Sequence, residues 1–300
     1  MTPALEKRLL ACMPLVFVLI WSTGFVAARW GMPHAPPLGF LAVRYALSIL
    51  AFALWIWWSR AAWPPGRQQW LHLAVTGIFL HAGYLGGVWA AVKDGIGAGT
   101  VALIVGLQPL LTALWVSASG QGQRTSAPQW AGHALGLGGL MLVVWHKLDV
   151  GEVRTGNFAL ALFALASITT GTLYQKRFVA PCDVRTANCV QLLAALVVTL
   201  PLAFLEALLS SGSVDWQLEL IGAMAWSVLA LTLGGSSLLY LLIQRGAATQ
   251  VTSLMYLVPP CTALLAWWLF GETLTLRMAL GLVLAAVGVW LVARHASNTR

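Results

Sequence analysis

The sequence predicts an all-α polytopic membrane protein whose ten transmembrane helices form two inverted five-helix repeats. The first observation behind this prediction is composition: charged residues make up 9% of the 300 residues and hydrophobic residues 59%, and the mean hydropathy is +0.82. A soluble domain carries about 25% charged residues. In a bilayer the backbone must satisfy its own hydrogen bonds, which leaves helices or a closed barrel. The apolar runs are about 20 residues long and do not alternate, so they indicate helices.

The second observation is an internal repeat. The segment Pro109–Leu114 (PLLTAL) returns 150 residues later as Pro259–Leu264 (PPCTAL). Further matches follow at offsets of 149 or 147 residues: Gly122-Gln123 with Gly271-Glu272, Gly132 with Gly281, Gly139 with Gly288, and Thr23-Gly24 with Thr170-Gly171. We therefore expect one repeat over residues 1–147 and a second over 156–296. Two like halves in a membrane chain are typical of a transporter whose site lies where the halves meet.

Ten apolar runs, most of them rich in leucine and alanine, are long enough to span a bilayer and leave only short connections between them. The predicted spans of the first half are roughly 9–29, 38–58, 69–91, 97–117 and 128–146. Those of the second half are roughly 157–177, 186–208, 217–242, 249–269 and 275–294. The first run has no convincing cleavage site after it, so we expect a retained helix and not a signal peptide.

The distribution of basic residues predicts the orientation. With both termini in the cytoplasm, 11 Lys and Arg residues lie inside and 5 outside, with Arg44 left within a helix, which accounts for all 17. This bias follows the positive-inside rule for a multi-pass membrane protein. Five spans per half is an odd number, so the second repeat enters the membrane from the opposite side. The net charge of +8 is scattered over many loops, which argues against a nucleic-acid partner.

Prolines interrupt the fourth and ninth predicted spans at equivalent places, at Pro109 and at Pro259 and Pro260. A proline removes one backbone N–H and opens the helix. In transporters such paired breaks expose backbone groups to the substrate, whereas elsewhere they only shape packing. Gln108 and Tyr256 are the polar side chains placed to join such a site.

Aromatic and hydroxyl side chains cluster within several spans and predict an apolar, aromatic cavity for a small amphipathic molecule. The candidates are Trp21, Ser22 and Thr23 in the first span, Thr170 and Tyr174 in the sixth, His81 and Tyr84 in the third, and Tyr240 in the eighth. The alternative for the hydroxyls is a bond to the preceding turn of their own helix.

Among the ionisable residues of the predicted spans, His81 and Arg44 are the two functional candidates. His81 titrates near neutral pH in its ordinary state, so proton coupling and a simple helix-packing hydrogen bond are the two hypotheses for it. Arg44 lies six residues into the second span and needs a partner, which is either structural or the carboxylate of a substrate. Glu272 is expected to cap the tenth helix, and glycines in the fifth and tenth spans are expected to allow close helix packing.

The sequence offers little for an enzyme. The four Asp residues lie far apart, no HExxH motif is present, and the four cysteines show no metal spacing, so we expect neither catalytic activity, nor a metal, nor a cofactor. A channel is the next alternative, but it favours a continuous polar stripe along several helices. A membrane scaffold without transport is the remaining alternative, and saturable flux distinguishes a carrier from it.

At these residues the chain resembles the drug/metabolite transporter superfamily, specifically its EamA-type members. The resemblance rests on Leu19–Phe25, Arg44-Tyr45, Leu257–Pro260 and Leu269–Leu274 and covers essentially the whole chain. The first half has Gly122-Gln123 where the family pattern has Gly-Glu. The resemblance implies an inner-membrane carrier that works by alternating access on a small molecule. We expect export of amino acids or related amphipathic compounds; import of metabolites by the same fold is the alternative, and monomer and homodimer both stay open.

Overall fold

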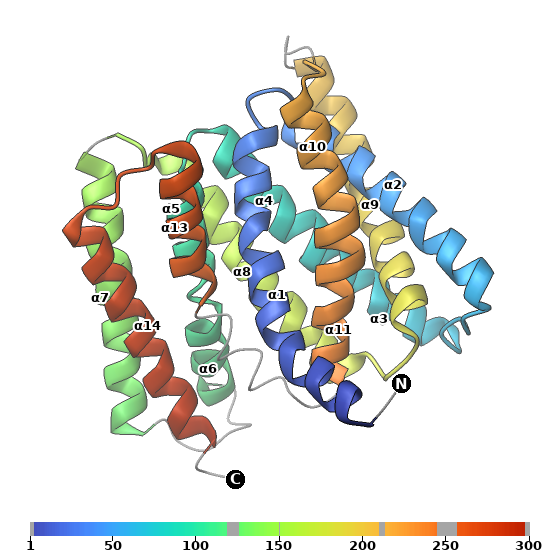
Figure 1. The fold of residues 1–300 in the computed structure, drawn as a ribbon, viewed down its shortest axis with the longest axis horizontal. Helices are drawn as coiled ribbons and strands as arrows, with labels where there is room; N and C mark the ends of the chain where they lie inside the picture. The colour runs from blue at the N-terminus through green and yellow to red at the C-terminus, as the bar shows by residue number, and fades with distance from the viewer. Residues whose placement is uncertain (1–2, 119–125, 150, 210–213, 245–256, 298–300) are drawn as a thin grey trace.

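The computed structural model describes residues 3–118, 126–149, 151–209, 214–244 and 257–297. Within these ranges the regular structure is entirely helical, and the helices run roughly side by side with short connections (Figure 1). The two chain ends lie at the same end of the molecule (Figure 1). We call this the terminal end, and the other the loop end.

Five helical spans make up the first half. They are α1 (Pro3–Gly31), α2 (Pro37–Ser59), a span of three segments α3 (Arg67–Gly77), η1 (Ile78–Gly83) and α4 (Tyr84–Lys93), a broken span α5 (Ala98–Val105) and α6 (Gln108–Ala118), and α7 (Ala127–Asp149). Pro37 opens α2 at a position where the missing N–H costs nothing. Arg60 ends α2 in the left-handed region, with a φ of 49°.

The second half repeats this order. Its spans are α8 (Thr155–Phe178), α9 (Val184–Leu209), a span of α10 (Leu218–Trp226), η2 (Ser227–Ser236) and α11 (Ser237–Gln244), then α13 (Val258–Phe270) and α14 (Leu276–Ser297). Five of the ten spans are long and apolar enough to cross a membrane, and five shorter apolar helices accompany them among the described residues. The predicted fold class is confirmed, and only part of the predicted span 249–269 lies outside the described residues.

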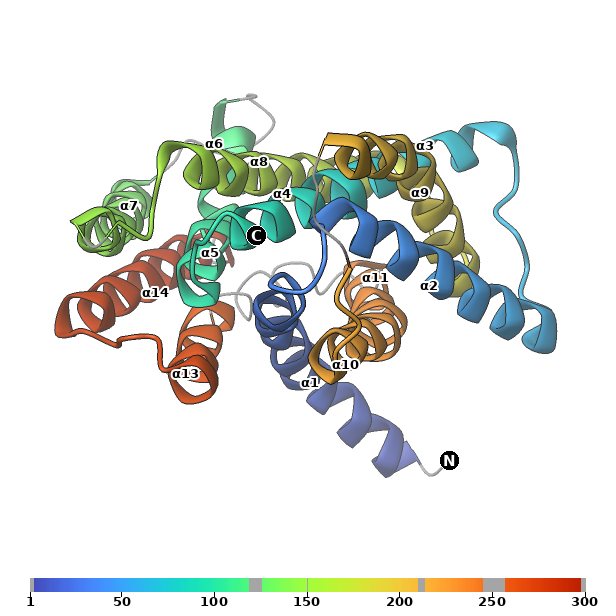
Figure 2. The ribbon, with the colours of Figure 1, turned by 90° about the horizontal axis from the view of Figure 1, so that it is seen from above.

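The packing partners of the two halves correspond to one another. In Figure 2, α7 packs with α14 at one edge of the molecule and α2 with α9 toward the other. Likewise α1 contacts α10, η2 and α13, while α8 contacts α4, η1, α5 and α6. Each contact has its counterpart when the halves are exchanged, which is what a pseudo-two-fold relation between inverted repeats requires.

Glycines hold α7 and α14 together. A β-carbon at Gly139 would lie 2.5 Å from the carbonyl oxygen of Gly281, and one at Gly288 would overlap the carbonyl oxygen of Gly132. The predicted close contact of the fifth and tenth spans is therefore confirmed at these positions. Gly138 is different, since a β-carbon there would meet nothing within 4 Å.

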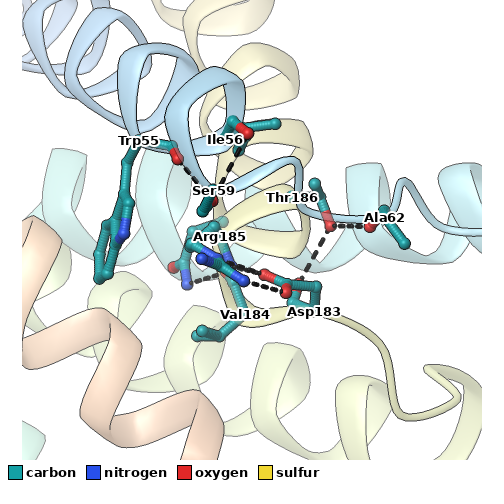
Figure 3. A network of polar contacts seen from close by, with 9 residues as sticks. Trp55, Ile56, Ser59, Ala62, Asp183, Val184, Arg185 and Thr186 are labelled. Atoms are coloured by element: carbon teal, nitrogen blue, oxygen red, sulfur yellow. Dashed lines mark hydrogen bonds and ion pairs between the residues drawn. The ribbon is translucent and has the colours of Figure 1, made fainter.

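Hydrogen bonds link both ends of α2 to α9. At the loop end the Glu206 carboxylate accepts from the backbone N–H groups of Leu38 (2.9 Å) and Gly39 (3.0 Å), which caps α2. At the terminal end the Thr186 hydroxyl donates to the carbonyl of Ala62 at 3.0 Å (Figure 3). Beside it Asp183 forms an ion pair of 2.6 Å with Arg185.

The sequence predicted that Glu272 caps the tenth helix, and this prediction is wrong. Its carboxylate accepts a hydrogen bond from the backbone N–H of Ala98 at 3.0 Å, and so caps α5 in the other half of the chain. Glu152 accepts from the N–H of Gly97 at the same helix start, at 2.9 Å. The reason is packing: α13 lies against α5, so Glu272, two residues after the end of α13, lies beside the free amides at the start of α5.

Candidate functional site

A cavity lies at the interface of the two halves. Three spans from each half contribute side chains to it: α1, α2 and the η1–α4 segment from the first, and α8, α9 and the η2–α11 segment from the second. The polar and aromatic side chains of the lining are Trp21, Phe25, Arg44, His81, Tyr84, Trp89, Gln175, Asn188, Gln191, Ser236 and Tyr240. The rest of the lining is glycine, valine, leucine and isoleucine, so the cavity is amphipathic.

Two segments of π-helix border the cavity, at equivalent places in the two repeats. They begin 149 residues apart, at Ile78 for η1 and at Ser227 for η2. In a π-helix the ladder of backbone hydrogen bonds is shifted, which frees carbonyl groups for side chains, and such segments are frequent at functional sites. Here the carbonyl of His81 accepts from the Tyr45 hydroxyl (2.8 Å), and that of Ser227 accepts from the Thr232 hydroxyl (2.8 Å).

Arg44 joins α2 to the second of these segments. Its Nε donates to the hydroxyl of Thr232 at 3.1 Å, and its guanidinium lies over the ring of Trp89, 5.8 Å from the ring centre. The residue is 3% exposed, and Nη1 has no hydrogen-bond partner within the described chain. An arginine in the middle of a bilayer costs about 2.5–3.5 kcal/mol on insertion scales unless an opposite charge offsets that cost. The lining of the cavity contains no acidic side chain that could do so for Arg44.

His81 lies on η1 and faces α9. Its side chain interacts with that of Gln191, and the Nε2 atoms of both residues lack a hydrogen-bond partner among the described residues. Gly77 makes this approach possible, because a β-carbon there would overlap the backbone of Gln191. The cavity thus holds a cationic donor on Arg44, an amide donor on Gln191 and the ring of His81.

Aromatic rings form the wall between these polar groups. Trp21 of α1 and Tyr84 of α4 are stacked with ring centres 6.3 Å apart, and Phe40 stacks on Trp89 at 4.5 Å. Such faces bind flat or apolar groups without requiring hydrogen bonds. The arrangement suits a ligand with one polar head and an apolar body.

The structure brings five of the predicted site residues together in this cavity: Trp21, Arg44, His81, Tyr84 and Tyr240. Four others lie on the same spans outside it, and their hydroxyls have other partners or face outward. Ser22 donates to the Val18 carbonyl, Thr23 to that of Ile20, Tyr174 pairs with His72, and Thr170 is exposed. Tyr256 lies outside the described residues.

The proline breaks meet each other beside the cavity. The fourth span is broken at Gly106 and Leu107, just before Pro109, and a β-carbon at Gly106 would lie 2.5 Å from Cγ of Pro259. Pro260 and Pro259 stand in the first turn of α13. A separate small pocket borders Gln108 and Pro109, and Trp21 and Phe25 line both this pocket and the central cavity. The amide of Gln108 donates to the Thr172 hydroxyl at 3.0 Å.

Sequence reasoning did not select four polar residues of the lining: Gln175, Asn188, Gln191 and Ser236. One signal pointed to Gln191, which stands opposite Arg44 in the repeat and differs from it in charge. An amide inside a predicted span, as at Asn188, is a second usable signal. No three His, Cys, Asp or Glu side chains in the described part of the chain lie close enough together to hold a metal ion.

Known proteins resemble the chain in sequence and in fold. Residues 9–145 and 156–294 each match the model of the EamA-like transporter family. The chain is 26% identical over 284 residues to a protein of Salmonella typhimurium described as a probable amino-acid metabolite efflux pump, with 92% of each chain covered. It is 28% identical over 294 residues to YedA of Escherichia coli K12, described as an uncharacterized inner membrane transporter, with 94% of this chain and 90% of YedA covered.

A solved crystal structure shares the fold, with a TM-score of 0.68 at 17% identity over 95% of this chain and 97% of that one. The family match extends over both halves of the chain, and the cavity lies between them. The chain belongs to the EamA-like transporter family of membrane transporters.

Proposed function

We propose that the protein is an inner-membrane secondary transporter that exports amino acids or related amphipathic metabolites, with both termini in the cytoplasm. The single observation that carries this proposal is the amphipathic cavity between the two repeats. Transporters of inverted repeats bind their substrates at this place. The repeats would run over residues 1–147 and 156–296, each contributing three spans to the cavity.

Substrate contact is assigned to the five predicted residues that line the cavity. Arg44 offers a charged head-group partner, Trp21 and Tyr84 offer a stacking surface, and His81 and Tyr240 offer hydrogen bonds. Ser22, Thr23, Gln108, Thr170 and Tyr174 lie outside the cavity, so they would contact substrate only in another conformation. The same applies to Pro109, Pro259 and Pro260, which would act as hinges.

Alternating access has a structural basis in the paired π-helical segments. Because η1 and η2 occupy equivalent places, a change in one has a counterpart in the other when the cavity opens to the opposite side. Tyr240 lines the cavity, and its hydroxyl lies 3.0 Å from Sγ of Cys182. We propose that this contact breaks when the cavity opens to the cytoplasm.

Export is favoured over import by the relative described as an efflux pump. Import of metabolites by the same fold is the alternative. The direction of flux in vesicles with a known orientation of the protein distinguishes export from import.

Proton coupling through His81 is a further part of the proposal, and it predicts that His81→Ala loses the response of flux to a pH gradient. Monomer and homodimer are distinguished by the mass of the detergent-solubilised protein.

Counterflow in sealed proteoliposomes tests the function. Vesicles loaded with an unlabelled amino acid or N-acyl amino acid should accumulate the labelled compound transiently and saturably. Trp21→Ala should reduce the flux, whereas Arg277→Gln, at an exposed position on α14, should leave it unchanged. Non-saturating conductance would indicate a channel, absence of flux with every compound a scaffold, and chemical conversion of the compound an enzyme.

A further inference from the structure

The central cavity has a positive charge and no acidic side chain to balance it. Arg44 lines the cavity, is 3% exposed and leaves Nη1 without a partner in the described chain. None of the lining residues is an aspartate or a glutamate.

The sequence extends this observation to the whole chain. It contains nine acidic residues: Glu6, Asp94, Asp149, Glu152, Asp183, Glu206, Asp215, Glu219 and Glu272. Those after Glu6 lie at helix ends or in connections, and the ranges that the structure leaves out contain no Asp or Glu. Glu6 lies fifteen residues before Trp21, which is about 22 Å along a helix.

The partners of Arg44 carry only partial negative charge. They are the hydroxyl oxygen of Thr232 and the face of the Trp89 ring. Thr232 in turn donates its own proton to the carbonyl of Ser227, which leaves its oxygen free to accept from Arg44. This fixes the guanidinium in place without neutralising it, and a fixed donor fork suits a carboxylate.

We propose that the ligand of this cavity is a net-anionic amphipathic carboxylate, such as an N-acyl amino acid or an aryl carboxylate, and not a zwitterion or a cation. The inference rests on the proposed function, whose substrate class it narrows. The carboxylate would pair with Arg44, and the free ammonium group of an ordinary amino acid would meet a second positive charge with no acid nearby. An unmodified amino acid therefore binds more weakly than its N-acyl derivative.

The remainder of the cavity fits the other parts of such a molecule. The stacked rings of Trp21 and Tyr84 offer a surface for an apolar or aromatic body. The amides of Gln175, Asn188 and Gln191 come from α8 and α9, and Gln191 Nε2 lacks a partner in the described chain. Such groups hydrogen-bond an acyl amide well.

A series of phenylalanine derivatives tests the proposal, because its members share one ring and differ in charge. N-acetyl-L-phenylalanine is an anion, L-phenylalanine a zwitterion, N-acetyl-L-phenylalaninamide neutral and phenethylamine a cation. Affinity is measured on the purified full chain in detergent by calorimetry and thermal shift. We expect the anion to bind at least about tenfold more tightly than each other member, since only it makes a charge-assisted bond without an unpaired ammonium.

Two variants should reduce the preference for the anion, one by removing the positive charge and the other by adding a negative charge. Arg44→Gln should bring the affinity for the anion down to that of the neutral amide. Gln191→Glu adds a carboxylate on α9 inside the cavity, and should weaken the anion while strengthening L-phenylalanine. Arg277→Gln, which removes the same charge from an exposed position on α14, is the matched control and should leave the ranking unchanged.

The ranking in the wild-type protein decides the proposal even if a variant fails to fold. Equal or tighter binding of L-phenylalanine or phenethylamine overturns it, as does the absence of binding by the whole series. Counterflow separates this result from the function proposed above. If the anion binds as expected and no compound is transported, the ligand class stands and the transporter proposal fails.

Discussion

The carboxylate of Glu272, in the connection after α13, accepts a hydrogen bond from the backbone N–H of Ala98 at the start of α5, 174 residues away in sequence. Two halves of the chain are thereby joined at the loop end of the molecule. Glu152 adds a second carboxylate at the same helix start, where it accepts from the N–H of Gly97 and from the hydroxyl of Thr100, both at 2.9 Å. Carboxylates are stabilising at a helix N-terminus because they satisfy free amides and oppose the helix dipole.

Removal of this cap should destabilise the protein. We expect Glu272→Ala to lower the free energy of unfolding by about 0.5–2 kcal/mol, the usual cost of a lost N-cap. Glu272→Gln should lose less, because its amide oxygen still accepts from Ala98. Thermal unfolding in detergent measures both, and Glu219→Gln, at an exposed position in the first turn of α10, is the control. Equal stability of Glu272→Ala and wild type would contradict the role assigned to this contact.

The contact of α7 with α14 predicts a position-dependent effect of added methyl groups. Gly139→Ala places a β-carbon 2.5 Å from the carbonyl oxygen of Gly281, so the helices must separate. Overpacking of this kind costs about 1–3 kcal/mol. Gly138→Ala, one residue away, meets nothing within 4 Å and should be neutral or slightly stabilising, since alanine favours a helix. Thermal unfolding of the two variants compares them directly, and a similar loss in both would show that the glycines do not act through this contact.

The hydroxyl of Thr232 fixes Arg44 in the cavity, and its removal should affect ligand affinity more than folding. Thr232→Val keeps the shape but leaves Nε of Arg44 without its acceptor at 3.1 Å. Thr232→Ser retains the hydroxyl and is the matched control. We expect Thr232→Val to weaken binding of N-acetyl-L-phenylalanine about tenfold, by loss of orientation of the guanidinium, and Thr232→Ser to keep most of the affinity. Calorimetry on the purified variants measures this, and equal affinities would mean that Thr232 has no positioning role.

Much of the fold could be predicted from the sequence, because hydrophobic length and the repeat are both visible in it. Ten spans and an inverted duplication follow from runs of about 20 apolar residues and from the pairing of Pro109 with Pro259. The cavity was predicted in part: an aromatic or ionisable residue in the middle of a span, such as Trp21 or Arg44, has few reasons to be there unless it faces the interior.

Other features had no signal in a single sequence. The π-helical segments η1 and η2 contain ordinary apolar residues, and only their equivalent positions mark them as a pair. Thr170 and Tyr174 were expected to face the site, yet a helix turns about 100° per residue, and their face depends on how α8 is rotated. The partner of Glu272 depends on the packing of α13 against α5, which no local pattern encodes.

The ion pair at the terminal end predicts a pH dependence of stability. The side chain of Arg185 donates to both carboxylate oxygens of Asp183, and its backbone N–H donates to one of them (Figure 3). The side-chain hydrogen bonds from Arg185 are the largest cause that holds the pKa of Asp183 below its ordinary value, and the backbone N–H adds to it. A lowered pKa in the folded state means that the stabilisation is present above the unfolded pKa of about 3.9 and is lost as the pH falls through the folded pKa.

Asp183→Asn should therefore be less stable than wild type at pH 7, and the difference should shrink below about pH 4 as the wild-type carboxyl takes up a proton. Arg185→Gln should show the same trend, since it removes the other partner of the pair. Glu219→Gln, at an exposed position in the first turn of α10, provides the control for a general effect of charge. The measurement is the unfolding temperature in detergent from pH 7 to pH 3 for all four proteins. A wild-type advantage over Asp183→Asn that stays constant across this range would mean that the ion pair does not stabilise the fold, and that any defect of the variant arises from the amide.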